Sequence, residues 1–131
     1  MSSESLHEAA EKLSPATIER HRATVSLMEE LEAIDWYDQR IDAAIDPTLK
    51  EILRHNRDEE KEHAAMVLEW LRRQDPVLDK QLRAYLFKEG DVVAVEAGLE
   101  AAGAAGGATP APDASDGSLG IGDLRGKEVA P

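Results

Sequence analysis

The sequence predicts an all-α fold: an antiparallel hairpin of two long helices followed by a shorter third helix. Ala, Glu, Leu and Arg dominate the 131 residues, and aromatic residues make up only 4%. Unbranched side chains of this kind lose little rotamer freedom in a helix. A Ser or Asp followed by Pro occurs at three well-separated places, and apolar residues recur between them at spacings of three and four. This length allows one domain with a modest core.

Each Ser-Pro or Asp-Pro pair predicts the start of a helix. The Ser or Asp side chain can accept hydrogen bonds from backbone N–H groups that have no partner within the helix, and Pro fits the first helical position. We therefore expect helices from about Pro15 to Ala44, from Pro47 to Gln74 and from Pro76 to Lys88, the last ended by Glu89-Gly90. The very short turn between the first two makes them an antiparallel hairpin.

Flexible segments are expected on both sides of this helical domain, which we place at residues 14–97. Residues 1–13 predict a flexible N-terminus. Residues 98–117 are rich in Ala, Gly and Pro and have nothing to bury, which is typical of a flexible linker. A short segment of apolar residues and glycines, Ser118 to Arg125, follows within the tail at residues 118–131.

The charge balance excludes several classes of partner. Asp and Glu number 27 against 15 Lys and Arg, for a net charge of −12. Such a surface repels nucleic acid and anionic membranes and attracts cations. No apolar run is long enough for a membrane span or a signal peptide, so we expect a cytoplasmic protein. Without cysteine, a metal site must use Glu, Asp and His, which suit iron or manganese.

Ionisable residues interrupt the apolar stripe of each long helix. The stripe of the first helix is Ala23, Leu27, Glu30, Ile34, Tyr37 and Ile41, and that of the second is Leu49, Leu53, Asn56, Glu60, His63, Val67 and Trp70. A carboxylate in a bundle core is costly unless it is compensated. Glu60 and His63 share one helical face and can hold one ion together, while Glu30 from the facing helix can bridge two ions.

This set is half of a di-iron site. Di-iron carboxylate bundles use a Glu from each of two helices and a Glu-x-x-His from each of two others. One chain supplies one of each, so a two-fold dimer completes the set. Two alternatives stay open: a non-catalytic scaffold or cargo adaptor whose polar core residues fix the helix register, and a different di-metal enzyme, using manganese or reducing peroxide.

Long segments of the chain resemble the encapsulated ferritins. They are HRATVSLMEELEAIDWYDQRIDA (His21 to Ala43), HNRDEEKEHAAMVLEWLRRQDP (His55 to Pro76) and LRAYLF (Leu82 to Phe87). In that family a helical hairpin dimerises into a ferritin-like four-helix bundle, and five dimers form a ring. The resemblance implies that residues 14–97 are a half-ferritin domain with ferroxidase activity, oxidising Fe(II) with oxygen at a di-iron site on the dimer interface.

The resemblance also implies roles for particular residues. Glu30, Glu60 and His63 match the family's iron ligands, in agreement with the stripe. Trp36 and Tyr37 match aromatic residues beside the site: Tyr37 is predicted to be catalytic, and Trp36 to lie just outside the metal ligands. Aromatic residues at bundle interfaces nevertheless more often serve packing. Glu29 and Glu32 match acidic residues that attract metal ions at the entrance, where calcium or another divalent ion is expected.

The tail carries a separate resemblance. SLGIGDLR, Ser118 to Arg125, is similar to the peptide that docks cargo into encapsulin shells. Leu119, Ile121 and Leu124 are apolar anchors for a groove, and the glycines let the backbone lie close to it. The expected partners are therefore a second copy of this chain and an encapsulin shell protein. The expected location is an encapsulin nanocompartment in the cytoplasm, where the oxidised iron would be stored.

Overall fold

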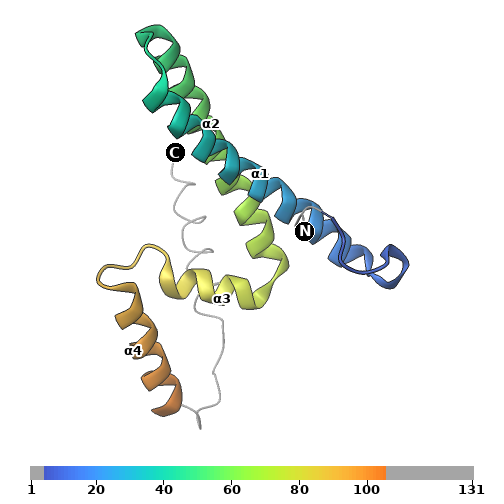
Figure 1. The fold of residues 1–131 in the computed structure, drawn as a ribbon. Coiled ribbons are helices and arrows are strands. Elements are labelled where there is room, and N and C mark those ends of the chain that lie inside the picture. Colours follow the sequence, from blue (N-terminus) through green and yellow to red (C-terminus); the bar gives the residue numbers. More distant parts are fainter. Residues whose placement is uncertain (1–4, 106–131) are drawn as a thin grey trace, which may run out of the picture. The chain divides into compact units, whose positions relative to one another are not determined.

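The computed structural model describes residues 5–105 and confirms the all-α class. In this part of the chain a short 3-10 helix, η1 (Ala10–Lys12), precedes four α-helices and no strand occurs (Figure 1). The chain divides into two compact units, one ending at Lys88 and the other beginning at Glu89. None of the described helices combines the length and apolar character that crossing a membrane requires.

The first unit is built on the predicted hairpin. Helix α1 (Pro15–Ala43) and helix α2 (Pro47–Gln74) lie side by side and antiparallel, joined by residues 44–46 (Figure 1). Ser14 Oγ accepts a hydrogen bond of 3.1 Å from the N–H of Thr17. Asp46 Oδ2 accepts one of 2.8 Å from the N–H of Leu49. The caps predicted from the Ser-Pro and Asp-Pro pairs therefore form.

Helix α3 (Pro76–Tyr85) follows α2 after a single residue, Asp75. The side chain of Asp75 caps α3 by accepting hydrogen bonds from the backbone N–H groups of Val77 and Leu78. The sequence predicts this helix to reach Lys88, but Leu86 has extended backbone angles and Phe87 a left-handed φ of 59°. This change of backbone conformation ends the helix before Glu89-Gly90.

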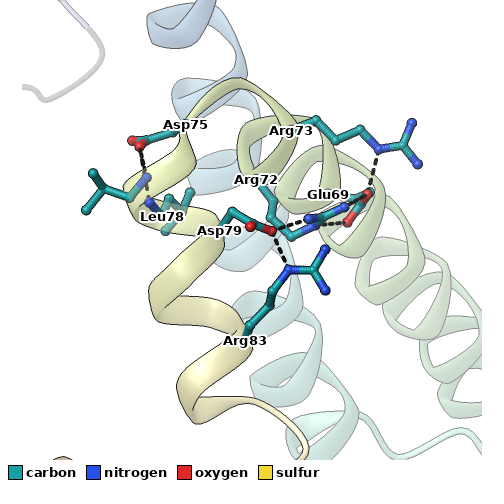
Figure 2. Close-up of polar contacts among 8 residues, drawn as sticks. Glu69, Arg72, Arg73, Asp75, Leu78, Asp79 and Arg83 are labelled. Atoms are coloured by element: carbon teal, nitrogen blue, oxygen red, sulfur yellow. Dashed lines mark hydrogen bonds and ion pairs between the residues drawn. The ribbon is translucent and has the colours of Figure 1, made fainter. Parts of the chain in front are cut away.

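A network of ion pairs fixes the bend between α2 and α3 (Figure 2). Arg72 on α2 donates two hydrogen bonds of 2.7 Å to Glu69 and also bonds to Asp79 on α3. Asp79 in turn accepts one of 2.9 Å from Arg83. Arg72, together with Arg73, holds the pKa of the Glu69 carboxyl at about 2.

The hairpin buries little of its own apolar surface. Only Ile41, Ala64 and Leu71 are buried hydrophobic residues in the described part of the chain. Many large apolar side chains of α1 and α2 are exposed instead: Leu31, Trp36, Leu49, Ile52, Met66 and Trp70. A core this small stabilises a domain of this size poorly.

The second unit contains a helix that the sequence analysis does not predict. Helix α4 (Val92–Ala105) starts at Asp91, whose Oδ2 accepts a 3.0 Å hydrogen bond from the N–H of Ala94. It occupies residues 98–105, where we expect linker, because alanine is the best helix former and outweighs Gly98 and Gly103. The remainder of the expected linker and the segment Ser118 to Arg125 lie outside the described residues.

Candidate metal centre

The hairpin turn determines which residues of α1 and α2 face each other. Ile45 is the middle residue of the turn, and Glu30 and Glu60 lie equally far from it along the chain. Helices that rise equally per residue bring two such positions opposite each other. His63 follows Glu60 by about one turn of α2 and so shares its face. The connection and the helical repeat together bring the three residues to one place.

The three side chains converge within a single chain. One ligand atom from each of Glu30, Glu60 and His63 lies within 4.8 Å of the others. The imidazole Nδ1 of His63 is 3.4 Å from Oε2 of Glu60 and 3.7 Å from Oε2 of Glu30. The side chains of both glutamates are 24% exposed and that of His63 is 49% exposed. The cluster therefore lies on an accessible face of the hairpin.

The two carboxyl groups titrate as a pair. A hydrogen bond to Glu60, followed by desolvation, raises the pKa of Glu30 above its usual value. The same hydrogen bond, with a contribution from His63, lowers the pKa of Glu60. Glu30 is thus the carboxyl group that retains a proton longer, because it can donate that proton to ionised Glu60. A cation bound between the two carboxylates would replace this shared proton and neutralise their charge in its place.

The donor atoms suit a divalent transition metal. Two carboxylates and one imidazole offer oxygen and nitrogen ligands, which Fe²⁺ and Mn²⁺ accept. Three ligands leave coordination positions open on an ion held by one chain. The exposed side of His63 and the partly exposed carboxylates leave room for further ligands from outside the chain.

The other predicted site residues lie outside this cluster in the single chain. Glu29 and Glu32 are exposed on α1, and Trp36 is exposed as well. Tyr37 is half-buried, with the guanidinium of Arg40 5.5 Å from the centre of its ring. They flank Glu30 along α1 without sharing its contacts with Glu60 and His63.

One cross-helix contact near the cluster is not predicted from the sequence. Arg57 on α2 donates a hydrogen bond of 2.9 Å from Nη1 to Oδ1 of Asp38 on α1. Neither residue interrupts an apolar stripe, so the spacing of apolar residues does not single them out. Asp38 lies seven residues from Ile45 and Arg57 lies twelve residues from it, so their distances from the turn give no signal of this contact.

Comparison with known proteins identifies the family. A family model described as EncFtn-like matches residues 5–89, the part that contains the hairpin, the cluster and α3. The chain belongs to the EncFtn-like family. This EncFtn-like chain is 59% identical to the encapsulated ferritin-like protein of Rhodospirillum rubrum over 128 aligned residues. The alignment covers 96% of this chain and 91% of that protein.

Further relatives match smaller parts of this EncFtn-like chain. A ferritin-like protein of Thermotoga maritima is 49% identical over 90 residues, 69% of this chain and 79% of that one. An encapsulin nanocompartment cargo protein of Myxococcus xanthus is 35% identical over 104 residues, 77% and 80% of the two chains. The crystal structure of a protein from Nitrosomonas europaea, 57% identical, superposes with a TM-score of 0.64 over 66% of this chain and 94% of that one.

Proposed function

We propose that this chain is a ferroxidase that oxidises Fe(II) with oxygen at a di-iron site formed between two copies. The observation that carries the proposal is the convergence of Glu30, Glu60 and His63, whose ligand atoms lie within 4.8 Å of one another on an accessible face. Clusters of two carboxylates and an imidazole also occur on protein surfaces that bind no metal ion. In a ferritin-like family, however, this cluster has the donor set that iron chemistry uses.

A second copy of the chain would complete the site. One chain contributes one Glu and one Glu-x-x-His, half of the ligands of a di-iron bundle. The exposed apolar residues support pairing, because Met66 and Trp70 lie on α2 to one side of the cluster and Leu49 and Ile52 to the other. A two-fold axis at the cluster would bring the first pair of one chain against the second pair of its partner. The predicted ring of five dimers is a further step of assembly.

Iron is the substrate of the proposed reaction. Each Fe²⁺ gives up one electron, and one O₂ that receives two electrons and two protons leaves as hydrogen peroxide. The carboxylates of Glu30 and Glu60 favour this oxidation because hard, negatively charged oxygen ligands stabilise Fe³⁺ more than Fe²⁺. His63 would hold the ion that Glu60 also binds, and Glu30 would bridge the two ions.

Residues beside the cluster take supporting roles in this proposal. Glu29 and Glu32, exposed on α1, would draw Fe²⁺ or another divalent ion such as calcium toward the entrance by their charge. Tyr37 lies about two helical turns from Glu30 on the same face of α1 and would stand beside the reacting iron. Trp36 would pack against the partner chain near the ligands.

The proposed place of action is the interior of an encapsulin shell in the cytoplasm. The Myxococcus xanthus relative is named an encapsulin nanocompartment cargo protein, and the Rhodospirillum rubrum relative an encapsulated ferritin-like protein. The segment Ser118 to Arg125, with its apolar anchors, would bind the inner surface of the shell protein. The shell would then store the ferric product.

Substitutions in the cluster test the activity directly. Glu60→Ala and His63→Ala should each lower the initial rate of Fe(II) oxidation at least on the order of tenfold, since changes even outside the ligand set have that effect in metal sites. Glu51→Ala removes an exposed carboxylate of α2 and should keep the rate. Ferric absorbance and oxygen uptake report the reaction together. Full activity of both cluster variants would refute the assignment, and oxygen uptake with Mn²⁺ alone would favour the manganese enzyme.

A further inference from the structure

Arg57 is a potential competitor of the metal for the cluster. It lies on α2 three residues before Glu60, so the two side chains emerge from one face of the helix, about one turn apart. An arginine at this spacing can form an ion pair with a carboxylate, and its planar guanidinium matches both oxygens. A guanidinium on Glu60 would occupy the oxygens that the proposed site offers to a cation.

The structure directs this guanidinium elsewhere. Nη1 of Arg57 donates to Oδ1 of Asp38 at 2.9 Å, and Nε donates to Oδ1 of Asp58 at 3.1 Å. The Arg57 side chain is only 23% exposed, whereas that of Asp38 is 54% exposed. The hydrogen bond to Asp38, ahead of the one to Asp58, raises the pKa of Arg57. Two carboxylates outside the cluster thus hold the guanidinium.

Of these two partners, Asp38 determines where the guanidinium lies. Asp58 is the next residue on the same helix and also pairs with Lys61, at 3.6 Å. Asp38 belongs to α1 and lies eight residues nearer the turn than Glu30, which is about 12 Å along the helix axis. A hydrogen bond to Asp38 therefore draws the end of the Arg57 side chain toward the turn, away from Glu30 and Glu60.

We infer that Asp38 is a positioning residue that withdraws Arg57 from the metal ligands and so leaves Glu60 free to bind a divalent cation. The inference rests on the proposed metal-binding role of the cluster. Without the Asp38 carboxylate, Arg57 would lose its cross-helix partner. Glu60, about one helical turn away on the same face of α2, is then a carboxylate within reach of the Arg57 side chain. Arg57 would compete with the metal there, and its competition would weaken in high salt.

Anaerobic titration of the full-length apoprotein with Mn²⁺ under calorimetry tests the inference, because Mn²⁺ suits the ligand set and binding is measured without any oxidation step. Asp38→Asn should weaken binding by about fivefold, the factor that corresponds to one exposed ion pair. Asp38→Glu keeps the charge and should bind like the wild type. Arg57→Gln should also bind like the wild type, and the double variant Asp38→Asn with Arg57→Gln should regain wild-type affinity.

The outcomes separate three explanations. Equal binding by Asp38→Asn and the wild type overturns the inference. If Arg57→Gln weakens binding as much as Asp38→Asn, and the double variant is not rescued, the ion pair only fixes the register of α1 against α2 and the inference is also wrong. If the wild type itself takes up no Mn²⁺ and no anaerobic Fe²⁺, the proposed function fails. Helicity and thermal unfolding of each variant, followed by circular dichroism, show whether the hairpin is intact.

Discussion

Glu30 and Glu60 lie opposite each other on antiparallel helices and share a hydrogen bond that raises the pKa of the first and lowers that of the second. One proton between two carboxyl groups lowers their mutual repulsion in the absence of a metal. The pair is therefore stable without an ion and ready to exchange the proton for one. His63, 3.4 Å from Glu60, is in position to share that ion.

Metal binding should therefore release protons. The raised pKa of Glu30 means that the pair retains a proton at a higher pH than an isolated carboxyl group, and the metal must displace it. Mn²⁺ affinity should fall as the pH is lowered into the range where the Glu30–Glu60 pair retains its proton. Calorimetry in two buffers of different ionisation enthalpy counts the protons released. An affinity independent of pH would contradict the paired cluster.

Acid should loosen the bend between α2 and α3. Arg72 and Arg73 lower the pKa of Glu69 from 4.5 to about 2. Because the folded-state pKa is lowered, the stabilisation from Glu69 is fully present above pH 4.5 and is lost as the pH falls toward about 2. Glu69→Gln should lose part of this pH dependence while unfolding at a lower temperature near neutral pH. Thermal unfolding across this range measures it, and identical pH profiles for both proteins would contradict the account.

Removal of the tail should separate encapsulation from catalysis. A variant lacking Asp116 to Pro131 retains every residue of the hairpin and its cluster, so its rate of Fe(II) oxidation should match that of the full chain. It should no longer co-purify with a co-expressed encapsulin shell protein, because the apolar anchors of the proposed docking segment are gone. A second variant keeps the full length but replaces Leu119, Ile121 and Leu124 with Ser. It should also fail to co-purify with the shell, which separates loss of the anchors from loss of the tail. Encapsulation of either variant would contradict the role of the segment.

The sequence predicts the hairpin well because its signals are local. Ser14-Pro15 and Asp46-Pro47 start α1 and α2 where predicted, and the caps they predict are formed. The predicted end of α3 was wrong because it depends on the backbone angles of Leu86 and Phe87, and a left-handed φ is uncommon for a bulky residue such as Phe. Helix α4 is not predicted because Gly98 and Gly103 favour a linker, whereas in the structure the helix preference of the surrounding alanines prevails.

The candidate site was predictable only in part. Glu30, Glu60 and His63 stand out because each interrupts an apolar stripe, and the structure brings them together. Asp38 and Arg57 carry no such signal. Their contact depends on how a long side chain crosses between two helices, and the sequence gives spacing along one helix but not this direction. The roles of Glu29, Glu32, Trp36 and Tyr37 stay predictions, since they concern the space that a partner chain would enclose.

Native mass spectrometry of the anaerobic protein with added Fe²⁺, before and after oxygen, tests the central claim most directly. The claim is that one chain holds half a site and that two copies complete it. We expect two irons per dimer, multiples of this in larger rings, and rapid oxidation when oxygen is admitted. Dimers that take up no iron, or single chains that bind and oxidise iron as fast as dimers, would contradict the account.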